Sequence, residues 1–146
     1  MDNSANTYTA NRTMPPCTII PVLVYANVAE TIDWLCNTFG FNERWRVGNH
    51  RAQLSFGNDT IAINEGQMVS EARSDRQLHS LLVRVHDIAA HYDHAKRNGA
   101  EIIHAPADFP YGERQYTVKD LGGHMWTFSQ SIEDLAPEDW GGVTAR

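Results

Sequence analysis

The stretch YGERQYTVKDLGGHMWTF, residues 111–128, decides the fold because it contains two strands joined by a turn. Gln115 to Lys119 alternates and carries the β-favouring residues Tyr, Thr and Val, and Met125 to Phe128 resumes with Trp and Phe two residues apart. Asp120 to Gly123 supplies turn residues between them. The stretch therefore predicts a β-hairpin.

The hairpin closes an ordered set of elements in the second half of the chain. Asp87 is a helix cap, and Ile88, Tyr92 and Ala95 form an apolar stripe that ends at Asn98-Gly99. The predicted order is a strand, a helix, a strand, a proline-containing loop and the hairpin, over residues 78–85, 87–99, 100–104, 105–112 and 115–128.

The first half of the chain shows the same order. Asn27 caps a striped helix that ends at Gly40, and the predicted strands around it span residues 18–25, 41–47, 51–56 and 60–64. With an offset of 60, Asn27-Val28-Ala29 meets Asp87-Ile88-Ala89, and with the offset grown by three, Arg51 meets Arg114. Repeated order predicts two βαβββ modules and an α+β fold, with other α+β sandwiches as the alternative.

Length and charge limit the class of protein. The 146 residues fit one domain, and the formal charge of -6 with no basic run argues against a nucleic-acid partner. No apolar segment is long enough to cross a bilayer and no leader is recognisable, so we expect no membrane partner and a cytoplasmic location with Cys17 and Cys36 reduced.

The expected domain organisation has three parts. Residues 1–16 form a flexible tail, and residues 17–131 form one domain of two modules, 17–65 and 78–131, with a polar linker between them. Residues 132–146 pack on the domain or on a partner subunit through Leu135 and Trp140.

The chain resembles the vicinal oxygen chelate superfamily, which includes glyoxalase I, extradiol dioxygenases and bleomycin-resistance proteins. The resemblance covers residues 18–131 and is carried by the first helix with its Phe39-Gly40-Phe41 ending, and by Tyr111-Gly112-Glu113-Arg114 through Asp120-Leu121-Gly122-Gly123-His124-Met125-Trp126. The latter is similar to a "GdR…DPfGhrW" pattern of the metal-free-looking branch, with Leu121 in place of Pro. The resemblance to the superfamily implies that each module curls into half a barrel, that paired modules enclose a ligand cavity, and that the protein forms a homodimer.

The same resemblance locates the metal-ligand positions of metal-dependent members. Here they are Ile20, Ala62 or Asn64, Ser80 and Thr127, and none is a good ligand for a divalent ion. We therefore expect no cofactor. The alternative is one divalent metal ion held by an unusual set drawn from His50, Glu65, His79 and His104.

Strand parity separates the helix side of each sheet from the cavity side. Leu81, Val83 and Val85 form one apolar face, which leaves Ser80, Leu82 and Arg84 on the other. An arginine there needs an anionic ligand or a carboxylate such as Glu65, Glu101 or Glu113. The predicted ligand-binding residues are Arg84, Thr127, Ser80, Asn64, Met125, Tyr111 and Arg114, and no catalytic residue is assigned.

The expected positions of the histidines can be explained without a metal ion. His86, His91 and His94 are expected at the surface, His124 at the hairpin turn, and His50 and His104 at the cavity rim. The leading hypothesis is metal-independent binding or sequestration of a small anionic or aromatic compound. The rivals are a glyoxalase-like, metal-dependent lyase or isomerase and a scaffold with a vestigial cavity.

Overall fold

In a computed structural model of the chain, residues 8–67 and 78–145 are described. The chain divides into two compact units, one before and one after residue 68. Most of the predicted linker, 68–77, and the first seven residues of the predicted tail lie outside the described residues.

The first unit is a four-stranded sheet with one helix. Its elements are β1 (Val22–Tyr25), α1 (Val28–Phe39), β2 (Asn42–Val47), β3 (Arg51–Phe56) and β4 (Asp59–Glu65). The strand order is β1-β4-β3-β2, in which β1 runs parallel to β4 and the other neighbours are antiparallel.

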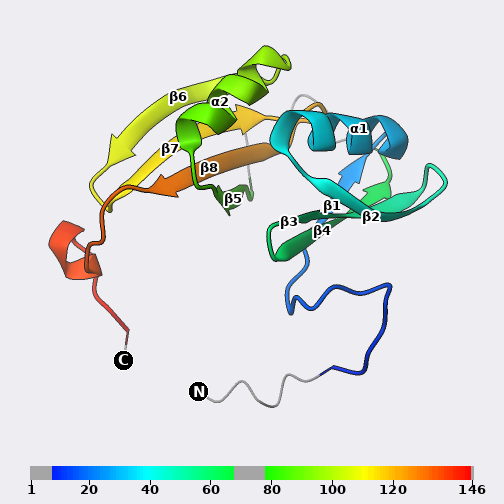
Figure 1. The fold of residues 1–146 in the computed structure, drawn as a ribbon, viewed down its shortest axis with the longest axis horizontal. Helices are drawn as coiled ribbons and strands as arrows, with labels where there is room; N and C mark the ends of the chain where they lie inside the picture. The colour runs from blue at the N-terminus through cyan, green and yellow to red at the C-terminus, as the bar shows by residue number, and fades with distance from the viewer. Residues whose placement is uncertain (1–7, 68–77, 146) are drawn as a thin grey trace. The chain divides into compact units, whose positions relative to one another are not determined.

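The second unit repeats this topology (Figure 1). Its elements are β5 (Leu81–Arg84), α2 (Ile88–Arg97), β6 (Glu101–Phe109), β7 (Glu113–Lys119) and β8 (Met125–Ser131), followed by a short 3-10 helix, η2 (Pro137–Trp140). The order is β5-β8-β7-β6, with β5 parallel to β8. The predicted α+β fold of two βαβββ modules is confirmed.

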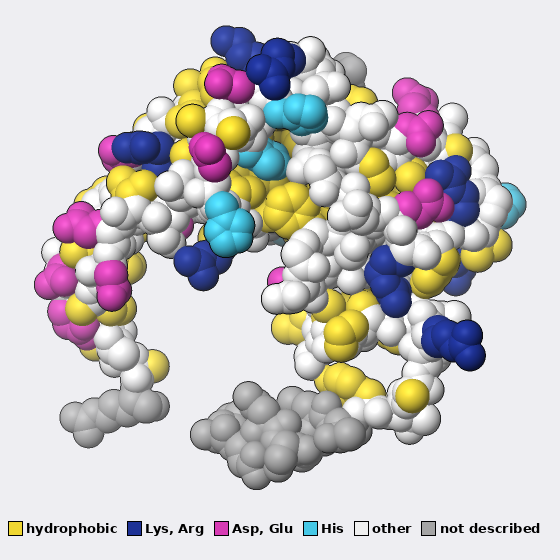
Figure 2. All heavy atoms as spheres, in the orientation of Figure 1, with side chains coloured by type: hydrophobic (Ala, Val, Ile, Leu, Met, Phe, Trp, Pro, Cys, Tyr) yellow, Lys and Arg dark blue, Asp and Glu magenta, His cyan; other side chains and the backbone are white. Residues whose placement is uncertain are grey.

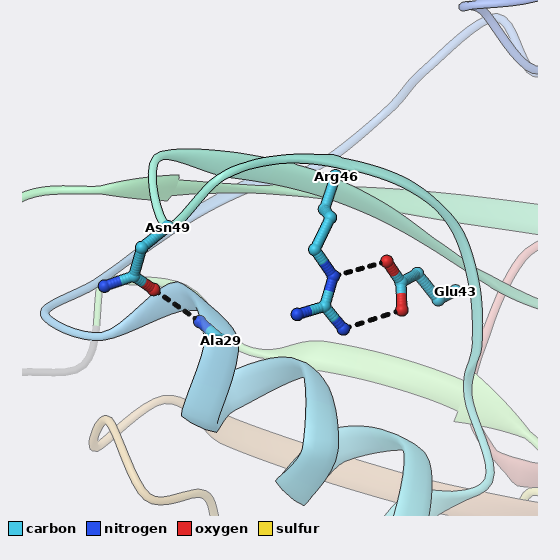
Figure 3. A network of polar contacts seen from close by, with 4 residues as sticks. All are labelled: Ala29, Glu43, Arg46 and Asn49. Carbon is cyan, nitrogen blue, oxygen red and sulfur yellow. Dashed lines mark hydrogen bonds and ion pairs between the residues drawn. The ribbon is translucent and has the colours of Figure 1, made fainter.

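Helix α1 begins and ends as its sequence predicts. The Asn27 side chain accepts a hydrogen bond from the Glu30 N–H, and Gly40 ends the helix in the left-handed conformation with φ 93°. A second amide, Asn49 in the β2–β3 turn, accepts from the Ala29 N–H at 2.7 Å (Figure 3). Two of the N–H groups that a helix start leaves unpaired are thus satisfied by side chains.

Helix α2 also starts with two N–H groups that are paired with side-chain acceptors. Asp87 accepts from the Ala90 N–H at 3.1 Å, and the Gln130 side chain of β8 accepts from the Ile88 N–H at 2.9 Å. The apolar stripe of the helix packs on β7 and β8, where Tyr116, Val118, Trp126 and Phe128 are fully buried.

The surface placement predicted for His91 is wrong. Its Nδ1 lies 2.6 Å from the Tyr116 hydroxyl, and its ring lies 4.1 Å, centroid to centroid, from that of Phe128. The side chain is half-buried between α2 and the sheet, because position 91 lies one turn after Ile88 on the packing side of the helix. Burial raises the pKa of Tyr116, so its hydroxyl keeps the proton it can share with His91.

The hairpin from which the fold was read is held by Asp120. This carboxylate is 5% exposed. Its Oδ1 accepts from the N–H groups of Gly122 and His124, each at 2.9 Å, and its Oδ2 accepts from the Trp126 indole at 2.9 Å. One buried acid therefore ties the turn to the centre of the core.

Strand β6 is longer than predicted. The proline-containing segment assigned to a loop continues the strand to Phe109, with two irregularities in its pairing to β7. Pro106 is tolerated because β6 is an edge strand, where a missing N–H breaks no inner ladder. Strands β1 and β5 are shorter than expected, with four residues each.

The register also corrects the alignment of the two modules. Val24 and Arg51 both pair with Asn64, whereas Arg84 and Gln115 both pair with Ser129. Arg51 is thus equivalent to Gln115 and not to Arg114. The same ladders make Ala62 the equivalent of Thr127, because they pair with Val22 and Leu82 respectively.

The described part of the N-terminal segment contacts β2. The Trp45 indole donates to the Thr13 carbonyl at 3.1 Å, the Arg44 guanidinium donates to the Arg12 carbonyl at 3.3 Å, and Pro15 is buried. These contacts belong to the first unit alone.

Candidate functional site

The candidate site is the face of the second sheet that α2 does not cover. Cross-strand partners share a face, so the pairing defines four rows of side chains on this face. The rows are Met125, Lys119 and Glu101; Leu82, Thr127, Thr117 and His104; Arg84, Ser129, Gln115 and Ala107; and Ser131, Glu113 and Phe109. Hydroxyl and amide groups dominate the last three rows, where Arg84 and Glu113 lie on adjoining rows, and the first row carries the Lys119 and Glu101 side chains.

Glu113 is the centre of a hydrogen-bonded chain, here named the Glu113 network: Arg84, Ser131, Glu113, Ser129, Gln115 and Tyr111. On one side, Arg84 donates to the Ser131 hydroxyl at 3.0 Å, and Ser131 donates to Glu113. On the other side, Ser129 donates to Glu113 at 2.6 Å.

The second arm of the network continues to an aromatic ring. The Gln115 amide nitrogen donates to the Ser129 hydroxyl at 3.1 Å, and the Tyr111 hydroxyl donates to the Gln115 carbonyl oxygen, also at 3.1 Å. Every donor in both arms therefore points towards Glu113, which is the common acceptor.

The surroundings of Glu113 favour its ionised form. Partial burial opposes the charge, but the hydrogen bonds from Ser129 and Ser131 and the positive charge of Arg84 outweigh it, so the pKa of Glu113 is lowered. Of the three carboxylates considered as partners for Arg84, Glu113 is the one that Arg84 reaches, through the Ser131 hydroxyl. Glu101 instead lies 4.0 Å from Lys119.

Arg84 retains donors for a ligand. A guanidinium has five N–H donors, and the hydrogen bond to Ser131 uses one. Among the described residues, no carboxylate lies within ion-pair distance of Arg84. The side chain is exposed on the edge strand β5, so an anion can approach it.

The other predicted site residues are only partly brought together. Thr127 shares a hydrogen bond of 3.1 Å with Thr117 on the same face, and Met125 lies on that face two residues before it. Ser80 is exposed just before β5. Asn64 belongs to the first unit, and Arg114 lies on the opposite face of β7, where it donates to Asp108 at 2.6 and 3.1 Å.

Four members of the Glu113 network are not among the predicted ligand-binding residues: Ser129, Ser131, Gln115 and Glu113 itself, which was expected only as a possible partner of Arg84. Ser129 and Ser131 follow Thr127 at intervals of two, so strand parity would have found them had β8 been extended beyond Phe128. Gln115 follows Glu113 by two residues on β7, so the same alternation places both on one face. The alternating pattern was present in the sequence, but the sequence did not show that β8 continues to Ser131.

The predicted metal-ligand positions do not fit a divalent ion. Ala62 has no donor, Thr127 is engaged with Thr117, and Ser80 is a weak ligand. In the ranges 8–67 and 78–145, no three His, Cys, Asp or Glu side chains lie close enough together to hold a metal ion. Of the alternative set, His50 and Glu65 are neighbours at 3.1 Å in the first unit.

The remaining histidines take different positions. His104 lies opposite Thr117 on the face of the candidate site, and His79 is exposed before β5. His124 is half-buried at the hairpin turn, where its backbone N–H is held by Asp120.

No helix in the described part of the chain is both long and apolar enough to span a membrane. The architecture is that of an α+β protein built from two βαβββ units, each with an open sheet. The model of the Glyoxalase/Bleomycin resistance protein/Dioxygenase superfamily matches residues 16–128, and the chain belongs to this superfamily. A search among curated proteins finds no match.

Solved structures share the fold. TioX from Micromonospora sp. ML1 is 27% identical with a TM-score of 0.67, over 80% of this chain and 99% of that chain. The fosfomycin resistance protein FosX from Mesorhizobium loti is 15% identical with a TM-score of 0.62, over 80% and 93%. FosX from Listeria monocytogenes, in complex with Mn(II) and sulfate, is 16% identical with a TM-score of 0.66, over 81% and 92%.

Proposed function

We propose that the protein binds a small compound with an anionic group, without using a divalent metal, on the face of the second sheet that carries the Glu113 network. The observation that supports this most directly is Arg84. It is an exposed guanidinium with unused donors beside a wall of hydroxyl and amide groups. A planar guanidinium is well suited to pairing with carboxylate or phosphate oxygens.

The Glu113 network supports the proposal by fixing the position of Arg84. Ser131 joins the guanidinium to Glu113, so the side chain is oriented before a ligand arrives. Orientation in advance reduces the conformational entropy lost on binding. Glu113 has both oxygens engaged by Ser129 and Ser131, so it acts as an internal counter-charge.

Family membership supports a small-molecule ligand in a general way. The relatives named above include resistance proteins, and FosX from Listeria monocytogenes is described with a sulfate ion. That ion belongs to the other protein. For this chain, binding and its independence of metal remain proposals.

The test is a calorimetric titration of the full chain, treated with a chelator, with naphthalene-2-carboxylate and with its uncharged amide. We expect the acid to bind more tightly than the amide. Loss of a charge-assisted hydrogen bond should make Arg84→Gln bind the acid about tenfold more weakly or worse. The matched control is Arg114→Gln, which should stay within about twofold because Arg114 lies on the other face of β7.

Two outcomes would overturn the proposal. Equal binding of the acid by the Arg84→Gln variant and the wild type would remove Arg84 from the site. Recovery of tight binding or of turnover only after Ni, Zn, Mn or Fe is added back would favour the metal-dependent lyase or isomerase.

A further inference from the structure

Three aromatic rings meet where the Glu113 network ends at Tyr111. The rings of Phe109 and Tyr111 are stacked, with centroids 5.5 Å apart and planes inclined by 15°. The Trp140 ring meets Tyr111 edge-on at 5.6 Å and 63°. Offset-stacked and edge-to-face contacts are the arrangements that aromatic pairs prefer.

These rings are not a closed core. Phe109 is 39% exposed and Trp140 is 42% exposed, whereas Tyr116, Trp126 and Phe128 on the other face are fully buried. The Tyr111 hydroxyl is fixed by Gln115, so its ring stands beside the polar face and joins the aromatic group to it. The group therefore has ring surface accessible at the end of the candidate site.

The C-terminal segment that carries Trp140, residues 132–142, is held by hydrogen bonds and by a close contact with Gly112. The N–H groups of Ile132 and Glu133 donate to the Gly112 carbonyl at 2.8 and 3.3 Å, and Gly142 N–H closes η2 on the Pro137 carbonyl at 2.7 Å. Gly112 is required in this arrangement, because a Cβ there would lie 2.5 Å from the Glu133 carbonyl oxygen. The segment lies beyond residue 128, where the match to the superfamily ends.

Charge distinguishes the two ends of the site. Around Trp140 the segment carries Glu133, Asp134, Glu138 and Asp139, all exposed, and Figure 2 shows acidic and hydrophobic side chains interspersed there. An anion is repelled at this end, whereas an uncharged ring is not. The Arg84 guanidinium reaches Ser131 on β8. From β8 to Phe109 on β6, two strand spacings amount to about 10 Å.

We infer that Phe109, Tyr111 and Trp140 bind the ring of a planar aromatic acid whose anionic group is held by Arg84. This inference rests on the function proposed above and adds to it the chemical class of the ligand. Trp140 is then a specificity-determining residue contributed by the C-terminal segment.

The experiment compares two probes of equal charge and similar size on the full chain: naphthalene-2-carboxylate, which is planar, and decahydronaphthalene-2-carboxylate, which is saturated. We expect the wild type to prefer the planar acid, and Trp140→Ala to weaken its binding by about tenfold while leaving the saturated acid within about twofold. Trp140→Phe should restore most of the preference. Val143→Ala, in the same segment and 88% exposed, is the matched control and should change neither affinity.

A second variant tests the position of the ring without deleting it. Gly112→Ala should displace the segment and lower the affinity for the planar acid, with the helical signal in circular dichroism unchanged. If Trp140→Ala binds both acids like the wild type while Arg84→Gln loses both, the ring assignment is wrong and the proposed function survives. If neither acid binds to the wild type, both fail.

Discussion

The two sheets have the same strand order and the same helix placement, but their uncovered faces differ in chemistry. In the first unit, the two equivalent rows are Val22, Ala62, Gln53 and Trp45, and Val24, Asn64, Arg51 and Val47. In the second unit, the corresponding rows hold Thr127 for Ala62, Arg84 for Val24 and Ser129 for Asn64.

The difference shows which parts of the repeat belong to the scaffold. Caps, stripes and buried strand positions recur in both units, because each helix must start, end and cover a sheet in the same way. The positions that point away from the helix do not have this requirement. In the second unit they carry hydroxyl groups and the Glu113 network. We therefore expect changes to the scaffold to act alike in both units, and changes to the Glu113 network to act only in the second.

The largest effect is expected at a scaffold position where the units differ, the last hairpin turn, which Asp120 holds only in the second unit. Asp120→Ala should lower the free energy of unfolding by about 2–4 kcal/mol, because it leaves the buried Trp126 indole and two turn N–H groups without their acceptor. Urea denaturation measures the loss. Asp59→Ala, at the exposed β3–β4 turn of the first unit, is the control and should stay within about 0.5 kcal/mol.

A medium effect, equal in the two units, is expected at the helix caps. Asn27→Ala and Asp87→Ala should each cost about 1 kcal/mol, because each leaves one helix-start N–H without a side-chain acceptor. The exposed equivalents Asp33→Ala and Asp93→Ala serve as controls. Losses that differ severalfold between the two caps would contradict the view that the helices are equivalent parts of the scaffold.

A smaller, pH-dependent effect is expected only in the second unit. The pKa of Glu113 is lower in the folded chain than in the unfolded chain, so its ionised form stabilises the fold above the unfolded value of about 4.3. That contribution is lost as the pH falls through the lower, folded pKa. Glu113→Gln should therefore flatten the acid side of the stability profile between about pH 5 and pH 2.

The measurement is urea unfolding across this pH range. Glu101→Gln, an exposed carboxylate on the edge strand β6, is the matched control and should leave the wild-type slope in place. An unchanged slope in Glu113→Gln would show that the carboxylate is not held ionised by its two serines and Arg84.

The smallest effect is expected at the surface ion pairs, which occur in both units. Arg46 binds Glu43 with two hydrogen bonds (Figure 3), and Arg114 binds Asp108 in the same two-pronged way. Both pairs are exposed, so salt and water screen them. Arg46→Gln and Arg114→Gln should leave the melting temperature unchanged within error, and a clear loss in either would mean that its pair supports more than the surface.

Much of the fold was predictable because its signals are local. Asn27, Asp87 and Gly40 act on N–H and carbonyl groups within five residues, so their sequence positions specify the helix ends. Strand ends were less predictable. The extension of β6 through Pro106 and of β8 to Ser131 depends on which neighbour each strand has, and a neighbour is not a local property.

The alternation of side chains along each strand predicted only part of the site. Parity placed Arg84, Thr127 and Met125 on one face, but it could not choose Glu113 among three carboxylates or exclude Arg114 from that face while the alignment was shifted by one residue. His91 was misplaced for a related reason. Its contact with Tyr116 comes from a strand 25 residues away, which the helical pattern alone does not show.

Pro106 has a consequence for assembly. Strand β6 is an outer edge of its sheet, and an edge with regularly spaced N–H and carbonyl groups is a template on which a further strand can add. Here the proline has no N–H to donate, and the two pairing irregularities disturb the spacing of the groups around it. This edge is therefore protected against strand addition by another chain, and if copies of the protein associate through strand pairing, the joint must form at one of the other edges.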